Sequence, residues 1–503
     1  MIVNKLMNKL MNKIIKTRIP QIEHFMNNPF EVQNQVFHDL ISSAKNTVWG
    51  KFYDYKSIKN WETFNERVPL SDYNSLMPFF ERIRKGEENL LWSSEIKWFS
   101  KSSGTTSSKS KFIPVSEESL QECHYKGGKD MLALYINNYE DSQIFSGKSL
   151  ALGGSAQASD SNSDIFIGDV SAILIDNLPY WAEFFRTPKK EIALMPEWES
   201  KLQEMIKEVS LSNVVSLSGV PSWMLVLLNG VVEHTGKSLH EVWPNLEAYF
   251  HGGVNFNPYR LQFNKLLPDN INYMETYNAS EGFFGLQDSK YLDSLLLLLD
   301  YGIYYEFVSL DELGLENPKI INLSKVKKNV NYAMVISTNG GLWRYIIGDT
   351  VMFTEIKPFR FKITGRTTNF INLCGEELIS DNSNRAVEVA CAATDAIVSE
   401  YTAGPFLGET RYHEWIIEFD KEPNDMEKFS KILDITLQEL NSDYEAKRYK
   451  NIILQSPKIN IAEKGTFYLW LKSKGKLGGQ NKIPRLANNR DYVDEILEMI
   501  KIN

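Results

Sequence analysis

The chain has very little cysteine: only Cys123, Cys374 and Cys391 occur among its 503 residues, widely spaced and odd in number. Such a set argues against a disulfide framework and is typical of proteins kept in a reducing compartment. The spacing of cysteines and histidines that a zinc site needs is also absent. We therefore expect a cytoplasmic protein without structural disulfides or structural zinc.

Long hydrophobic runs are missing as well. The longest, Leu295 to Leu299, is far too short to span a bilayer. It continues through a short polar break into a second apolar run, Ile303 to Val308, and this pattern predicts a β-hairpin. The first 20 residues lack the continuous apolar stretch and the cleavage site of a signal peptide. Nothing therefore indicates export or stable membrane insertion.

The N-terminal segment is nevertheless amphipathic. Leu6, Leu10 and Ile14 share one helical stripe with two methionines, while four lysines lie on the other side. We expect a helix that packs on its own domain. A peripheral membrane helix is the alternative interpretation.

Positive charge is not in excess. Lysine and arginine total 55 against 64 aspartates and glutamates, which gives a net charge of −9. A general nucleic-acid footprint is therefore absent, and we expect no nucleic-acid partner. Any anionic ligand must be held by a few local lysines and arginines.

The length of the chain exceeds that of one hydrophobic core, so two or more domains are expected. The pattern becomes strand-rich from Asn272 onward, and a proline among charged residues at Lys357–Pro358 marks a boundary. We predict an α/β fold with a large N-terminal domain, residues 1–357. A small, mobile α+β domain, residues 358–503, would include a closing strand at Phe467 to Leu471.

Several secondary-structure elements can be predicted from periodicity. Helices are expected at residues 116–136, 197–209 and 221–235. Strands are expected at 273–276 and 332–337.

The most informative segment is Ser102 to Lys111, SSGTTSSKSK. It carries seven hydroxyl side chains, one glycine and two lysines between strand-like runs at 96–99 and 112–115. Backbone amides near a glycine, hydroxyl donors and ammonium groups suit a polyphosphate. The Walker pattern, with a second glycine and Lys-Ser/Thr opening a helix, is absent. A phosphate loop between two strands instead indicates an enzyme that adenylates carboxylates, with a solvated hairpin as the alternative.

Later motifs could complete a nucleotide site. The YNASE stretch from Tyr277 to Glu281 follows a predicted strand; the glutamate could hold Mg²⁺, and the tyrosine could stack on a base. Asp349, after a strand and a glycine, could accept hydrogen bonds from both ribose hydroxyls. Arg366 repeats that arrangement with a cation, and Lys482 lies in a glycine-rich basic segment. Each motif alone is also compatible with a solvated turn or tail.

Taken in this order, the motifs resemble the acyl-adenylate-forming superfamily. Within it the chain is similar to the Gretchen Hagen acyl-acid amido synthetases, the auxin- and jasmonate-conjugating enzymes of plants and their bacterial relatives. The similarity extends from Pro78–Ile83 to Gln480–Arg485, and the stretch Tyr277 to Leu286, YNASEGFFGL, is especially close. The resemblance implies a large adenylate-forming domain, with β-sheets flanked by helices plus a β-barrel, and a small mobile domain that carries the catalytic lysine.

The resemblance also implies roles for individual residues. Lys482 would reach the α-phosphate and the attacking carboxylate, Glu281 would bind Mg²⁺, and Arg366 would steady the nucleotide and the interdomain geometry. The implied ATP-binding set is Ser102, Ser103, Gly104, Thr105 and Thr106 around the phosphates, Gly252 and Gly253 beside the nucleotide, Tyr277 and Ser280 at the adenylate, and Asp349 at the ribose. His251 is a candidate proton acceptor or a structural histidine.

The predicted activity is that of a ligase that forms carbon–nitrogen bonds with ATP and Mg²⁺. A small carboxylic acid would be adenylated with release of pyrophosphate, and the amine of an amino acid would then displace AMP. One alternative is transfer of the acyl group to a thiol such as coenzyme A. Another is a nucleotide-binding relative without turnover. The sequence does not determine the acid, the amino acid or the oligomeric state.

Overall fold

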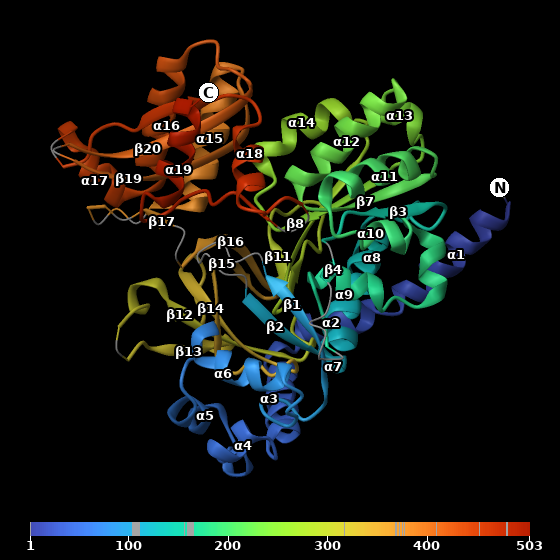
Figure 1. Cartoon of the computed structure of the whole chain (residues 1–503). Helices are drawn as coiled ribbons and strands as arrows, with labels where there is room; N and C mark the ends of the chain where they lie inside the picture. Colours follow the sequence, from blue (N-terminus) through green and yellow to red (C-terminus); the bar gives the residue numbers. More distant parts are fainter. Residues whose placement is uncertain are drawn as a thin grey trace.

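The computed structural model describes residues 2–102, 111–154, 156–157, 165–315, 317–367, 370–371, 373–374, 376, 378–408, 410–451, 453–478 and 481–502 (Figure 1). Mixed sheets and helices form a large N-terminal part and a smaller C-terminal part, so the predicted α/β class is confirmed. Within the described residues, no helix combines the length and apolar character needed to cross a bilayer.

Six helices open the chain: α1 Ile2–Lys16, α2 Ile19–Asn27, α3 Pro29–Ala44, α4 Val48–Phe52, α5 Trp61–Arg67 and α6 Tyr73–Arg84. Phe25, Phe37, Phe64 and Phe80 from these helices are buried in one core with the antiparallel strands of the large sheet. The helical lobe therefore supports the sheet that carries most of the candidate site.

The large sheet has twelve strands in the order β13-β12-β14-β15-β16-β11-β10-β9-β8-β7-β3-β6. Its parallel strands are β3 Lys148–Ala151, β6 Arg186–Thr187, β7 Val214–Gly219, β8 Ala248–Gly252 and β9 Asn272–Ala279. Its antiparallel strands are β10 Gly282–Leu286, β11 Leu295–Leu297, β12 Ile303–Ser309, β13 Ile320–Asn322, β14 Asn331–Thr338, β15 Tyr345–Ile356 and β16 Phe359–Arg366. The resemblance implies a β-barrel in this domain. In the structure the antiparallel strands continue the parallel strands within the same twelve-stranded sheet.

Helices cover the parallel strands, and the apolar residues of β7 and β8 are buried beneath them. The helices after α6 are α7 Glu117–Ser119, α8 Lys126–Asn138, α9 Val170–Asp176, α10 Lys190–Ala193, α11 Trp198–Ser210, α12 Pro221–Thr235, α13 Leu239–Val242 and α14 Arg260–Leu266. Helix α12 has the predicted bounds because Pro221 occupies its first turn and Gly236 ends it with φ +64°.

A second sheet, of four strands, has the order β2-β1-β5-β4. Its strands are β1 Ile96–Ser102, β2 Lys111–Ser116, β4 Ala156–Gln157 and β5 Phe166–Gly168. Strands β1 and β2 are antiparallel, and Ser102 lies opposite Lys111. The segment between them, 103–110, is therefore a connection between two strands, as the sequence predicts, although its own residues lie outside the described part.

The C-terminal part is built on the three-stranded sheet β19-β20-β21. Its elements are β17 Phe370–Ile371, β18 Leu378–Ile379, α15 Ser380–Thr394, β19 Ile397–Leu407, β20 Arg411–Lys421, α16 Met426–Leu440, α17 Ser442–Arg448, β21 Lys458–Ala462, α18 Thr466–Ser473 and α19 Asp491–Ile502. It has its own core, which contains Tyr401, Trp415 and Phe429. The division at residue 357 remains a prediction; Pro358 lies in the turn of the β15–β16 hairpin, inside the large sheet.

Two of the predicted strand arrangements are wrong. Strands β11 and β12 do not form a hairpin, because β11 pairs with β10 and β16 whereas β12 pairs with β13 and β14. The predicted closing strand is helix α18. Its buried side chains Phe467, Trp470 and Leu471 have the i, i+3, i+4 spacing of one helical face.

The N-terminal helix forms as expected but presents an unexpected face. Asn8 is 2% exposed, and its amide donates to the carbonyl of Ser142 over 2.9 Å. Met7, Leu10 and Ile14 are about half exposed, at 44%, 56% and 51%. The helix thus packs on its own domain through Asn8 and Ile15, while these three residues of the apolar stripe stay largely exposed.

Candidate active site

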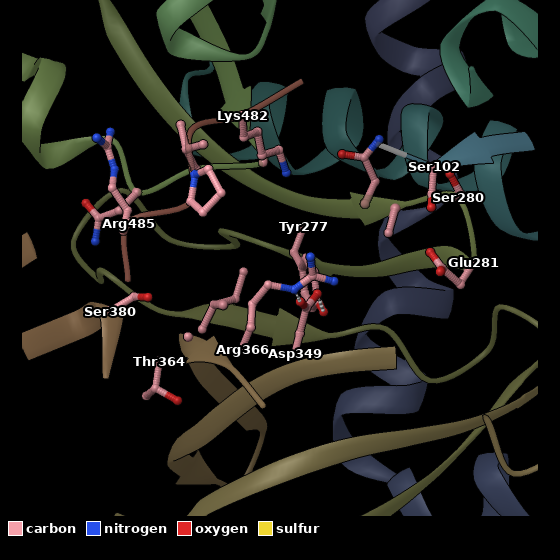
Figure 2. A pocket seen from close by; sticks show the side chains of 18 of the residues that line it. Ser102, Tyr277, Ser280, Glu281, Asp349, Thr364, Arg366, Ser380, Lys482 and Arg485 are labelled. Atoms are coloured by element: carbon pink, nitrogen blue, oxygen red, sulfur yellow. Dashed lines mark hydrogen bonds and ion pairs between the residues drawn. The ribbon is translucent and has the colours of Figure 1, made fainter. Parts of the chain in front are cut away.

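One cavity contains most of the residues that the sequence singles out. It lies between the ends of strands β8 and β9, the β15–β16 pair and segments of the C-terminal part (Figure 2). The predicted site residues that line it are Ser102, Gly253, Tyr277, Ser280, Glu281, Asp349, Arg366 and Lys482. Gly252 ends β8 directly beside this wall. Ser103, Gly104, Thr105 and Thr106 lie outside the described residues.

The β9–β10 hairpin supplies one wall of the cavity. Ala279 pairs with Gly282, so Ser280 and Glu281 form the two-residue turn between the strands. Figure 2 shows both side chains next to Ser102, the last described residue before the predicted phosphate loop. Burial raises the pKa of the Glu281 carboxyl, and the neighbouring Asp349 charge adds to this effect. A bound cation would reverse it and favour the ionised carboxylate.

Asp349 and Arg366 lie directly opposite each other on β15 and β16. Arg366 Nε is 2.8 Å from Asp349 Oδ1, and the Tyr277 hydroxyl donates to Asp349 Oδ2 over 2.6 Å. The Asp349 charge raises the pKa of Arg366, so the pair remains ionic. Gly348 precedes the aspartate with φ +94°, a conformation that favours glycine. The carboxylate is thus oriented from two sides while it still lines the cavity.

Lys482 enters the cavity from the opposite side, on a segment near the C-terminus (Figure 2). Burial, with a smaller contribution from the Arg366 charge, lowers the pKa of Lys482 to about 8, although Asp349 and Glu281 oppose this. A Cβ atom placed on Gly253 would lie 3.2 Å from both Cε and Nζ of Lys482, and Gly253 has φ +85°. Glycine is needed at residue 253 because a side chain there would crowd the ammonium group.

Charged side chains of both signs line the cavity. Two cations, Lys482 and Arg366, face the carboxylates of Glu281 and Asp349 around one space. No cluster of three or more histidine, cysteine, aspartate and glutamate residues that could bind a metal by themselves occurs in the described part of the chain. A single carboxylate near a polyphosphate suits Mg²⁺, which keeps waters and phosphate oxygens as its other ligands.

Family models match most of the chain. The GH3 family N-terminal domain matches residues 18–271, the central domain residues 296–366 and the C-terminal domain residues 381–491. The chain belongs to the GH3 family.

Relatives of this GH3 protein have similar lengths but low identity. It is 22% identical to indole-3-acetic acid-amido synthetase GH3.3 of Arabidopsis thaliana, over 93% of this chain and 91% of that protein. It is also 22% identical to jasmonoyl-L-amino acid synthetase JAR6 of Nicotiana attenuata, over 96% and 95% of the two chains.

Solved structures have the same fold. The GH3.15 acyl acid amido synthetase matches with a TM-score of 0.79 at 17% identity, over 97% of this chain and 96% of that one. A 2-hydroxyisobutyryl-CoA ligase in the postadenylation state matches with a TM-score of 0.60 at 12% identity, over 94% and 92% of the chains. The fold of this GH3 protein is therefore that of adenylate-forming ligases.

Sequence reasoning missed several residues of the cavity in this GH3 protein. The missed residues that line it are Lys101, Glu275 and Asp381, whereas Lys111 and Arg485 end two segments that the sequence singles out. Alternation along β9 could have identified Glu275, because it shares a strand face with Tyr277 two residues later. Burial raises the pKa of Glu275 to about 7. The others have no local signal, since the folding of distant segments brings them to the cavity.

His251 is enclosed in the fold of this protein. Its ring stacks on Phe256 with 4.1 Å between centroids, and burial lowers its pKa to about 3. It is 4% exposed and is not among the described residues that line the cavity. Burial and a lowered pKa make this imidazole a weak base, which favours the structural interpretation of His251.

Proposed function

We propose that this GH3-family protein is an ATP-dependent acyl-acid amido synthetase, which joins a small carboxylic acid to the amine of an amino acid. The observation that carries the proposal is the convergence of Lys482, the Asp349–Arg366 pair and Glu281 on one cavity from four separate stretches of the chain. The names of relatives, which include amido synthetases and a 4-substituted benzoates-glutamate ligase, support the same reaction type.

In this proposal the nucleotide extends along strand β9. The phosphates lie at the end where Ser102, Ser280 and Glu281 meet. Ser103, Gly104, Thr105 and Thr106 remain predicted phosphate ligands outside the described residues. The ribose lies at Asp349, whose carboxylate oxygens can each accept a further hydrogen bond beside those from Tyr277 and Arg366. Gly252 and Gly253 would lie beside the nucleotide through their backbone, because the space where a Cβ atom would stand is filled by Thr276 and by Lys482.

Adenylation requires two anions to meet. A carboxylate oxygen of the acid bonds to the α-phosphorus, and the bond to the β-phosphate oxygen breaks with loss of pyrophosphate. Lys482 would offset the charge that develops there, and Arg366 would add to the positive potential. At about 4 Å and an effective dielectric of about 20, one such cation contributes about 4 kcal/mol. Mg²⁺ held by Glu281 would supply further charge neutralisation.

Amide formation follows at the same carbonyl carbon. The amine of the amino acid forms a carbon–nitrogen bond, and the carbon–oxygen bond to AMP breaks. The proton that the amine loses passes to the departing phosphate or to water. AMP is a good leaving group, whereas the oxide of a free carboxylate is not. In this way the chain converts an unreactive acid into an acylating agent.

We also propose that the C-terminal part, which carries Lys482, is the mobile unit implied by the resemblance. The three-stranded sheet and the core around Tyr401, Trp415 and Phe429 support this division, although α18 and α19 share a second core with helices of the N-terminal part. A boundary after β16 fits the pairing of that strand with β15 better than residue 357 does.

A panel assay tests the function. Purified protein receives ATP, Mg²⁺ and one carboxylic acid at a time, including indole-3-acetate, jasmonate and 4-substituted benzoates, followed by either an amino acid or coenzyme A. Release of AMP together with an amide, only when an amino acid is present, is the expected result. A thioester would indicate transfer to a thiol, and nucleotide binding without AMP release would indicate a relative without turnover.

A further inference from the structure

The segment that carries Lys482 is attached to the C-terminal sheet through its backbone. Ala403 on β19 donates its N–H to the carbonyl of Arg485 over 2.9 Å. The N–H of Ala487 donates to the carbonyl of Ala403 over 3.0 Å. Two hydrogen bonds to one residue of β19 fix residues 485–487 to that strand, so Lys482 takes its position from the C-terminal part.

Arg485 joins this segment to the N-terminal part. Its Nη1 donates to Glu400 Oε2 over 2.6 Å, and its Nη2 donates to the Tyr259 hydroxyl over 2.6 Å. The Tyr259 hydroxyl donates in turn to Glu400 Oε1 over 2.7 Å. The three side chains close a ring of hydrogen bonds across the interface, because Tyr259 lies just before α14 whereas Glu400 lies on β19.

This ring is buried and charged. The Arg485 and Glu400 side chains are 12% and 16% exposed, and Tyr259 is 2% exposed. The Arg485 guanidinium also lies 4.5 Å from the ring centroid of Tyr401. Hydrogen bonds to charged groups away from water are stronger than neutral ones, so each bond of the ring matters for the alignment of the two parts.

The same two stretches of chain meet at a second point. Gly253 lies against the Lys482 ammonium, and Tyr259, six residues later, binds Arg485, three residues after Lys482. Contacts at two points fix both the distance and the direction between the two stretches. We propose that Tyr259, Glu400 and Arg485 form an interdomain latch, and that the latch positions Lys482 for adenylation. This inference rests on the proposed function.

Tyr259→Phe is the direct test, because it removes only the hydroxyl that connects the two charged partners. Glu400→Gln is the second variant and removes the charge while it keeps the shape. Gln262→Ala is the matched control: Gln262 Nε2 donates to the carbonyl of Val398 over 3.4 Å, so it crosses the same interface without contacting the segment of Lys482.

Three measurements are made on each variant. Hydrogen–deuterium exchange of the full chain without substrates reports the protection of residues 481–487. Carboxylate-dependent pyrophosphate exchange reports adenylation, with an acid that the panel identifies. Aminolysis of a supplied acyl-adenylate reports the second step. The latch predicts about tenfold or greater loss of both protection and pyrophosphate exchange in Tyr259→Phe and Glu400→Gln. Aminolysis should change by less than about twofold.

Two results would overturn the latch. One is unchanged protection of residues 481–487 in Tyr259→Phe. The other is an equal loss in both half-reactions, or a loss in Gln262→Ala of the same size, since either indicates a general effect on folding. If no acid supports pyrophosphate exchange in the wild-type protein, the proposed function fails, and hydrogen exchange alone then decides whether the latch holds the segment.

Discussion

Replacing Lys482 by methionine should separate activity from stability, because the two effects have opposite signs. Methionine keeps most of the side-chain volume and removes the ammonium. If that cation stands about 4 Å from the charge that develops on the α-phosphate, its loss removes about 4 kcal/mol at an effective dielectric of about 20. Carboxylate-dependent pyrophosphate exchange should therefore fall by about 10²- to 10³-fold.

The stability of the free protein should not fall with it. Burial lowers the pKa of Lys482 to about 8 from the ordinary lysine value of 10.5, so at pH 7 the folded state holds an ammonium in an unfavourable place. This shift corresponds to about 3 kcal/mol. Below pH 8, where the lysine is protonated in the folded protein, the free energy of unfolding is lower by that amount. Lys482→Met should thus have an equal or higher urea midpoint at pH 7. Its free energy of unfolding should exceed that of the wild type by as much as about 3 kcal/mol.

The assay pairs urea unfolding with pyrophosphate exchange on the same preparations. Full pyrophosphate exchange in Lys482→Met would refute the role of the lysine. A loss of exchange together with a large loss of stability would mean that misfolding causes the loss, which also contradicts this reasoning. The wild-type protein adds a pH test. Because the free ammonium titrates near pH 8, the kcat/KM of exchange for ATP should decline above that pH. A flat profile from pH 7 to 10 contradicts this reasoning.

Three further predictions concern the same cavity. Asp349→Asn weakens two hydrogen-bonded contacts and a ribose site, so the KM for ATP should rise about tenfold, and an unchanged KM argues against that site. Burial raises the pKa of Glu275 to about 7, so its stability contribution is present below pH 4.5 and is lost as the pH rises through 7. At pH 8 the free energy of unfolding of Glu275→Gln should therefore exceed that of the wild type by up to about 3 kcal/mol, and at pH 4.5 the two should be equal. A pH-independent difference in urea midpoints would contradict this. Gly253→Ala places a methyl group 3.2 Å from the Lys482 ammonium at φ +85°, so pyrophosphate exchange should drop about tenfold, whereas the same change at the exposed turn residue Gly86 should leave exchange intact.

Local signals predicted the parts of the site that depend on consecutive residues. The turn at Ser280–Glu281 follows from a strand pattern that ends in polar residues, and the structure has that turn between β9 and β10. The bounds of α12 follow from Pro221 and Gly236. The pairing of Asp349 with Arg366 has no such signal, because it needs the register of β15 against β16.

The predictions are wrong where one apolar run is compatible with several secondary structures or strand pairings. The stretch Phe467 to Leu471 reads as a strand because nearly every residue is apolar, but burial of residues 467, 470 and 471 makes it one face of α18. The apolar run at Leu295 to Leu299 likewise predicts a hairpin with the next apolar run, because the run itself does not show which strand it pairs with. Its strand β11 instead pairs with β16, more than 60 residues later in the chain. Sequence neighbours alone cannot reveal that choice.

Asp349 shows why the long-range contacts matter for chemistry. An isolated aspartate after a glycine can adopt several rotamers, and a ligand that fixes one of them loses part of its binding free energy. Here Arg366 and Tyr277 hold both carboxylate oxygens before any nucleotide arrives, so that entropic cost is met during folding. The same reasoning applies to Lys482, whose segment is held by β19 and by Tyr259 through Arg485. Asp349 and the segment of Lys482 are thus each held by partners from other stretches of the chain, and this explains why the individual motifs are ambiguous in the sequence but form a single site in the fold.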